Sequence, residues 1–110
     1  MVPEIDLQEF AAAHAGGAFV LDVREADEYV AGHVPGARQL PLAHLHRRLG
    51  ELPKTEPVYV VCASGNRSKT AASWLRVAGY DAISVAGGTG GWISQGRPVV
   101  RGLHADDTAA

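Results

Sequence analysis

The clearest local pattern in the chain lies at residues 58–68, which read Val58-Tyr59-Val60-Val61-Cys62-Ala63-Ser64-Gly65-Asn66-Arg67-Ser68. Its first four residues are β-branched or aromatic and predict a buried strand. From Ser68 the period changes to that of a helix, with an apolar face of Ala71, Ala72, Trp74, Leu75 and Ala78 that ends at Gly79. We therefore expect a strand, a short loop that starts at Cys62, and a helix.

Similar short elements are predicted on both sides of this unit. Asp6 and Glu9 have the spacing of a capping box, and the first helix they introduce is expected to end at Gly16 and Gly17. Further strands are predicted at 18–23, 38–40 and 82–85, and helical segments at 26–30 and 42–49. The glycine-rich run 87–91 predicts a loop, after which Trp92 begins a short helical turn.

Strands that alternate with short helices predict a three-layer α/β domain, with a central, mainly parallel sheet of about four to five strands flanked by helices. A single domain is expected over residues 1–101. The loss of apolar periodicity after Arg101 predicts a flexible tail over 102–110. Ligands of such folds bind beyond the carboxyl ends of the strands, where Asp22, Cys62 and the 87–91 run are all predicted to lie.

Composition and charge exclude several classes of protein. With 110 residues, 46% hydrophobic and 20% charged, the chain is not collagen-like, coiled-coil or largely disordered. Its formal charge is -2 and no basic cluster is long enough to follow a phosphate backbone, so nucleic acid is not an expected partner. The first six residues lack a leader pattern, and no apolar run is long enough to span a bilayer. We expect a soluble, cytoplasmic protein without a membrane partner.

The single cysteine, Cys62, excludes an internal disulfide and fits a reducing compartment. Because it lies between a strand end and a helix start, backbone amides and the positive end of the helix are expected to surround it as an anion cradle. These amides, and Arg67 if its guanidinium is near, would stabilise a thiolate and make the sulfur nucleophilic at neutral pH. The alternative is that Cys62 only ends a buried strand.

Four motifs together resemble those of the rhodanese-like domain. They are Leu21-Asp22-Val23-Arg24, Gly32-His33-Val34-Pro35-Gly36-Ala37, Val61-Cys62-Ala63-Ser64-Gly65-Asn66-Arg67-Ser68 and Gly87-Gly88-Thr89-Gly90-Gly91-Trp92. They occur in that family's order and cover the chain from Ala18 to Val100. Any one of these motifs alone would be weak evidence for the family, but the match of all four together is highly specific.

The resemblance implies a single-domain rhodanese in which Cys62 accepts a sulfane sulfur and holds it as a persulfide. The donor would be a small anion such as thiosulfate or a persulfide, and the acceptor a thiol or cyanide. The loop amides of Ala63, Ser64, Gly65, Asn66 and Arg67 are expected to stabilise the anionic states, with no metal and no cofactor. Since the sequence holds no second cysteine, we expect the acceptor to be another molecule, either small or a partner protein.

Two other functions stay open from the sequence. Cysteine phosphatases and arsenate reductases related to this fold also place a cysteine and an arginine around an anion cradle, but with five residues between them. Here four residues, 63–66, separate Cys62 from Arg67, which favours sulfur transfer. The other alternative is a non-catalytic rhodanese-like interaction or regulatory module; such modules commonly lack the cysteine that this chain keeps.

The charged and hydroxyl residues around the loop have competing interpretations. Arg67 is expected to orient an anionic donor rather than to point into solvent. Ser68 could donate to the sulfur, but a helix cap is favoured. Asp22 is expected to support the wall of the site by bonding loop amides or a neighbouring arginine. Arg24 and Glu28, four residues apart, have the spacing of a surface pair.

The histidines and glycines are interpreted as structural. The resemblance implies that His33 bonds backbone groups near the site rather than moving protons. His44 and His46 do not share a helix face, so no metal site is predicted. The 87–91 run lacks the spacing of a nucleotide-binding fingerprint. Its glycines are expected to let the backbone pass close to the cysteine loop, and Trp92 is expected in the core.

Overall fold

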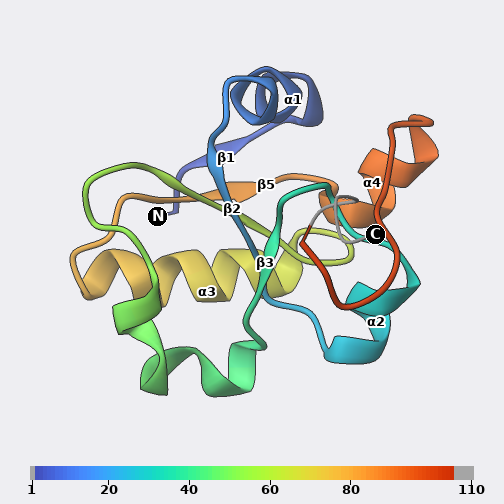
Figure 1. Ribbon diagram of the computed structural model, residues 1–110. Helices are drawn as coiled ribbons and strands as arrows, with labels where there is room; N and C mark the ends of the chain where they lie inside the picture. The colour runs from blue at the N-terminus through green and yellow to red at the C-terminus, as the bar shows by residue number, and fades with distance from the viewer. Residues whose placement is uncertain (1, 106–110) are drawn as a thin grey trace.

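The computed structural model, which describes residues 2–105, shows a five-stranded sheet with helices on both faces (Figure 1). The elements in chain order are β1 (Glu4–Ile5), α1 (Leu7–Ala15), β2 (Phe19–Asp22), α2 (Ala26–Ala31), β3 (Arg38–Gln39), the 3-10 helices η1 (Leu42–Arg47) and η2 (Leu49–Glu51), β4 (Val58–Val61), α3 (Asn66–Val77), β5 (Ala82–Val85) and α4 (Gly88–Ser94). The strand order is β1-β5-β4-β2-β3, and every adjacent pair is parallel. The predicted α/β class is confirmed.

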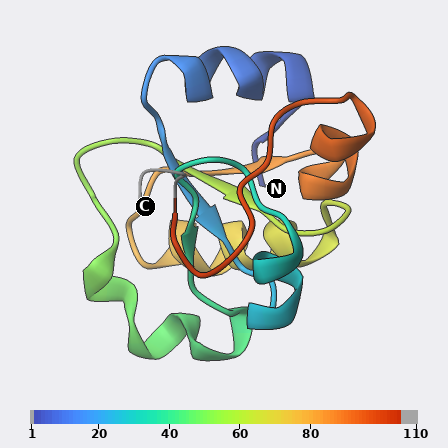
Figure 2. The same ribbon diagram turned by 45° about the vertical axis from the view of Figure 1, so that its right-hand side comes forward.

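Alternating side chains of the strands bury two hydrophobic clusters, one on each face of the sheet. Along β4, Val58 and Val60 pack toward α3 and the 3-10 helices, together with Leu75. Val61 faces the other way, into a cluster that contains Phe10 of α1 and Trp92 of α4. Figure 2 shows α1 and α3 on opposite sides of the sheet, as the two clusters require. The predicted core position of Trp92 is confirmed, since it is 3% exposed.

The register of the sheet brings the expected segments to one edge. Asp22 at the end of β2 lies beside Val61 at the end of β4, and Val60 lies beside Ser84 of β5. Because all of these strands are parallel, the segments that follow them leave the same edge of the sheet. Cys62 and the start of α4 therefore lie together at the carboxyl edge.

Several elements differ from the sequence-based expectation. β1 was not predicted, because two residues are too short to show an alternating pattern. Residues 42–51 form 3-10 turns rather than one α-helix. Trp74, placed on the buried face of α3, is 37% exposed and lies with its ring 4.5 Å from that of His46, so α3 buries a narrower stripe than expected.

The glycine-rich run 87–91 is largely helical rather than a loop. Gly87 has a left-handed backbone, with φ +84°, and α4 begins directly after it at Gly88. Glycine disfavours helices intrinsically, which is why the sequence indicates a loop here. Packing of this segment against the residues that follow β4 overrides that preference.

Residues 102–105 contact the body of the domain, whereas the sequence predicted a flexible tail from residue 102. The amide of Gly102 donates to the carbonyl of Val30 at 2.9 Å, and the amide of Gly36 donates to the carbonyl of Ala105 at 2.6 Å. Figure 1 shows this red segment running past α2. The remainder of the predicted tail, 106–110, lies outside the described residues. Across residues 2–105, no helix is long and apolar enough to cross a membrane.

The close approach of α4 to the cysteine loop requires glycine at position 88. A Cβ on Gly88 would overlap the carbonyl oxygen of Cys62, and its φ of +55° already disfavours other residues. We expect Gly88→Ala to lower the free energy of unfolding in urea by about 2–3 kcal/mol. Gly96→Ala is the matched control, because φ is +72° there but nothing lies within 4 Å of the added Cβ. It should cost about 1 kcal/mol, and equal losses in the two variants would contradict the packing argument.

Candidate active site

Cys62 leaves the carboxyl end of β4 and begins a tight turn into α3. The turn is completed by Gly65, whose φ of +113° is in the left-handed region, and α3 starts at the next residue. The Gly65 amide donates to Cys62 Sγ at 3.0 Å. Cys62 as a whole is only 1% exposed. The predicted strand, loop and helix are therefore confirmed, and at least one loop amide points at the sulfur.

The backbone of the cysteine loop is held from behind by α4. The amide of Thr89 donates to the carbonyl of Cys62 at 2.8 Å, and the amide of Gly90 donates to the carbonyl of Ala63 at 2.9 Å. A Cβ on Gly90 would lie 2.8 Å from the same Ala63 oxygen. The expectation that these glycines allow a close backbone approach is confirmed. With the two carbonyls bonded to α4, the following amides are free to face the sulfur.

Hydrogen bonds around Sγ favour the thiolate. Burial raises the pKa of the Cys62 thiol, but the Ser68 hydroxyl and the amides of Ser68, Gly65 and Ser64 outweigh it. The pKa of Cys62 therefore lies below its ordinary value. A cysteine that merely ended an apolar strand would lack these hydrogen bonds, and burial alone would raise its pKa.

Ser68 and Ser84 form a buried chain of hydroxyls behind the sulfur. Ser68 Oγ lies 3.6 Å from Cys62 Sγ and 2.8 Å from Ser84 Oγ. The cap favoured for Ser68 is wrong: Gly65 occupies the N-cap position of α3, and Ser68, one turn further on, is fully buried. Ser84 was not selected from the sequence. The sequence feature that could have indicated Ser84 is its hydroxyl group in a predicted strand, 82–85, that is otherwise apolar.

Arg67 is bound by Glu28 of α2. Its two terminal nitrogens, Nη1 and Nη2, each donate to one carboxylate oxygen at 2.7 Å. This bond lowers the pKa of Glu28 from 4.5 to about 2, and Glu28 in turn raises the pKa of Arg67. The expected surface pair of Arg24 with Glu28 is wrong, because Arg24 is buried and points elsewhere. The Glu28 contact had no signal in the sequence, since 39 residues separate the partners.

Asp22 and Arg24 form a buried ion pair at the end of β2. Arg24 Nε and Nη2 donate to the two carboxylate oxygens of Asp22 at 2.9 and 2.8 Å, and Nη2 also donates to the carbonyl of Gly32 at 2.9 Å. The prediction that Asp22 bonds a neighbouring arginine is confirmed. The pair ties β2 to the chain that follows α2 and so braces one wall beside the loop.

Both ring nitrogens of His33 lie within hydrogen-bond distance of backbone carbonyls. Nδ1 lies 2.8 Å from the Tyr29 oxygen, and Nε2 lies 2.8 Å from the His104 oxygen. The ring also stacks on Tyr29 with a centroid distance of 3.6 Å. Its expected bonding to backbone groups is confirmed, and neither nitrogen is free to face Cys62.

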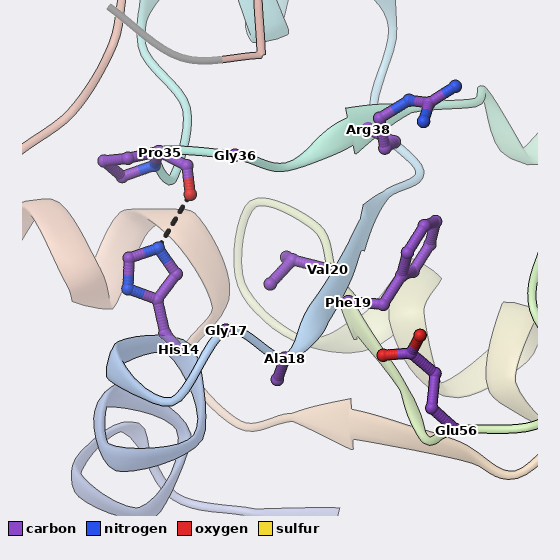
Figure 3. Close-up of a pocket in the computed structure, with 9 residues that line it drawn as sticks. All are labelled: His14, Gly17, Ala18, Phe19, Val20, Pro35, Gly36, Arg38 and Glu56. Carbon is purple, nitrogen blue, oxygen red and sulfur yellow. Dashed lines mark hydrogen bonds between the residues drawn. The ribbon is translucent and has the colours of Figure 1, made fainter.

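A cavity of about 370 Å³ lies away from this site, toward the amino ends of the strands (Figure 3). Its lining includes Phe19 and Val20 of β2, Arg38 of β3 and His14 of α1, whose Nε2 lies 2.7 Å from the Pro35 oxygen. It contains no residue of the cysteine loop. Within residues 2–105, no group of three or more His, Cys, Asp or Glu side chains is placed to hold a metal ion.

Comparison with known proteins identifies the family. A family model described as the Rhodanese-like domain matches residues 6–95. The chain belongs to the rhodanese-like domain family. The matched range includes residues 21–24, 32–37, 61–68 and 87–92, on which the resemblance was based.

Relatives of this rhodanese-like domain carry names from sulfur chemistry. A protein of Allochromatium vinosum named sulfurtransferase is 34% identical over 103 residues, covering 91% of this chain and 96% of that protein. YrkF of Bacillus subtilis (strain 168), whose name marks it as a candidate sulfur carrier protein, is 35% identical over 97 residues. The match covers 86% of this chain but 52% of YrkF, so the chain spans about half the length of that relative.

Solved structures show the same fold. A rhodanese-related protein from Thermoplasma volcanium superposes with a TM-score of 0.85 at 31% identity, covering 93% of this chain and 99% of the other. A rhodanese-like domain protein from Staphylococcus aureus gives 0.78 at 30% identity, covering 83% and 91%. The parallel sheet and its flanking helices are therefore those of the family.

The hydroxyl chain predicts how the thiol of this rhodanese-like domain titrates. Ser68→Ala removes a donor to the sulfur and should raise the pKa of Cys62, so alkylation by iodoacetamide at neutral pH should be about fivefold slower. Ser84→Ala should shift the pKa in the same direction by less, because Ser68 would lose its orienting partner. Alkylation rate against pH measures both. Ser73→Ala, exposed on the same helix, is the control, and a fall of equal size there would contradict the assignment.

The Glu28–Arg67 pair predicts a pH-dependent stability. A carboxylate with a depressed pKa stabilises the fold above its ordinary pKa of 4.5, and this contribution is lost as the pH falls toward about 2. Both side chains are about one-third exposed, so the contribution at neutral pH should be about 0.5–1 kcal/mol. Urea unfolding of the wild type and Glu28→Gln should show a difference that shrinks between pH 5 and about pH 2. A difference that is constant with pH would contradict this.

Proposed function

We propose that this rhodanese-like domain is a sulfurtransferase that carries a sulfane sulfur as a persulfide on Cys62. The observation that carries the proposal is the geometry at Cys62, where the Gly65 amide donates to Sγ at 3.0 Å and Ser68 Oγ lies 3.6 Å away. These hydrogen bonds lower the pKa of the thiol. The names of the relatives in Allochromatium vinosum and Bacillus subtilis support the same chemistry. The donor is a small sulfur anion such as thiosulfate or a persulfide, and the acceptor is a thiol, free or on a partner protein, or cyanide.

The first step loads the enzyme. The Cys62 thiolate attacks the outer sulfur of thiosulfate, so a bond forms between Sγ and that sulfur. The sulfur–sulfur bond of thiosulfate breaks, and sulfite leaves with its electron pair. The terminal sulfur of the persulfide keeps one negative charge. In this proposal the amides of Ser64, Gly65 and Ser68, which favour the thiolate, also stabilise this charge, without a metal or another cofactor.

The second step regenerates the Cys62 thiolate. An acceptor thiolate or cyanide attacks the outer sulfur, the bond to Sγ breaks, and Cys62 leaves as a thiolate. A thiol with a lowered pKa is a better leaving group, so the same hydrogen bonds assist both halves of the cycle. The free thiol that this requires suits a reducing compartment such as the cytoplasm.

The surrounding residues have positioning roles in this proposal. Ser68 orients toward the sulfur and is held by Ser84, α4 fixes the loop carbonyls, and the Asp22–Arg24 pair braces the wall. His33 supports the chain around α2. The four residues between Cys62 and Arg67 favour a sulfur donor over the tetrahedral phosphate that a five-residue loop accommodates.

Intact-mass spectrometry tests the proposal. Incubation with excess thiosulfate, and separately with a polysulfide, should add one sulfur atom to the protein, and cyanide should remove it as thiocyanate. Cys62→Ser should remain folded by circular dichroism and form no adduct. The proposal would be contradicted if the folded wild-type protein gained no sulfur from either donor although its Cys62 is alkylated normally. Hydrolysis of an aryl phosphate that is lost in Cys62→Ser would support the phosphatase alternative instead.

A further inference from the structure

The ion pair between Arg67 and Glu28 sets the charge at the edge of the cysteine loop. Arg67 lies five residues after Cys62 in the first turn of α3, close enough for the thiolate charge to raise its pKa. Both of its terminal nitrogens are engaged by the two oxygens of Glu28. Arg67, the cation expected to attract an anionic donor, is thus already neutralised by a carboxylate from another helix.

The other cations of the loop and the neighbouring strand end are compensated too. Arg24 is paired with Asp22, with both side chains buried, and cannot turn toward a ligand without breaking that pair. Lys69 lies 3.5 Å from Glu4 and is more than half exposed. Among residues 2–105, each basic side chain within 22–24 and 62–69 therefore has a carboxylate partner. The cradle at Cys62 stabilises negative charge through neutral amide dipoles rather than through a net positive charge.

We propose that Glu28 is a specificity-determining residue: by neutralising Arg67 it disfavours dianionic sulfur donors such as thiosulfate relative to persulfides of low net charge. This inference rests on the proposed sulfurtransferase function and names the donor class of that site. It differs from the expectation that Arg67 recruits the anion. Glu28 acts by cancelling that attraction.

The physical reason is the sum of charges that meet at Sγ. A dianion that approaches the Cys62 thiolate brings two negative charges against one, and the nearby Glu28 adds a further negative charge. If the donor displaced Glu28 from Arg67, the guanidinium would be free to bind it. The Glu28 carboxylate would still lie near the dianion and repel it. Arg67 lies close enough to Cys62 for their charges to interact, and one unit charge acting on a dianion near a protein surface changes its occupancy by about three- to tenfold. A donor without net charge escapes this effect.

A low-charge donor reacts by the same displacement. For a persulfide RS–S⁻ whose R group carries one ammonium, the Cys62 thiolate attacks the outer sulfur, the RS–S bond breaks, and RS leaves as a thiolate with the electron pair. The negative charge of the outer sulfur stays on the transferred atom, so the product is the anionic Cys62 persulfide, as with thiosulfate. No oxidant or reductant enters, and the net charge of the reacting pair is −1 before and after the step.

The test compares two donors on matched variants. Thiosulfate is the dianion, and cysteamine persulfide, a zwitterion, is the donor without net charge; the rate of Cys62 persulfide formation is measured by mass. Glu28→Gln should raise the ratio of thiosulfate to cysteamine persulfide rates by about three- to tenfold, and added salt should reduce this gain. Asp27→Asn, which removes one exposed carboxylate from the same helix, should change the ratio by less than about twofold. In Glu28→Gln/Arg67→Gln, the gain should disappear.

Two results would overturn the inference: an equal ratio in Glu28→Gln and Asp27→Asn, or a gain that persists in the double variant. Circular dichroism and alkylation by neutral iodoacetamide verify that each variant keeps its fold and its loop. Failure of the proposed function is a different result, since neither donor would then load any variant. In that case the role of Glu28 is tested by calorimetric titration, which compares the affinity of thiosulfate for Cys62→Ser with its affinity for Cys62→Ser/Glu28→Gln. Tighter binding to the second supports the role of Glu28, and equal binding overturns it.

Discussion

Two backbone hydrogen bonds, from the amides of Thr89 and Gly90 to the carbonyls of Cys62 and Ala63, determine the conformation on which the site depends. Buried backbone groups need partners, and the start of α4 supplies them to the carbonyls of the loop. The Gly65 amide is then directed at Sγ, and α3 can begin without a side-chain cap. This contact requires glycine at positions 88 and 90 of α4, because a Cβ on Gly88 or Gly90 would collide with the loop backbone.

The site stabilises negative charge with fixed dipoles instead of free cations. Amides and hydroxyls that are already oriented need no rearrangement when charge develops on sulfur, which is why such groups are effective in active sites. Among residues 2–105, the basic side chains within 22–24 and 62–69 are all paired: Arg24 with Asp22 in the interior, Arg67 with Glu28 at the edge, and the exposed Lys69 with Glu4. The buried pair serves to hold the wall in place, while the partly exposed pair is open to any ligand that approaches.

The sequence predicts the parts of this arrangement that are local. The strand 58–61, the turn at Gly65 and the helix after it follow from β-branched residues, a glycine and a change of period, and four family motifs place Asp22 and Cys62 at one edge. Contacts between distant segments are not visible in this way. Glu28 and Ser84 reach the loop from α2 and β5, and no spacing rule connects them with Cys62. The sequence predicts a helical turn only from Trp92, whereas α4 begins at Gly88, because a tertiary contact overrides the low helix propensity of glycine.

The burial of Cys62 also makes the thiol a reporter of conformational opening. The residue is 1% exposed, and its loop is bonded to α4, continuous with β4 and packed beside β5. A reagent too large to enter the cradle reaches the sulfur only when the loop opens locally, which costs less free energy than global unfolding if the sheet stays intact. The labelling rate with such a reagent measures the local stability of the site, apart from that of the whole domain.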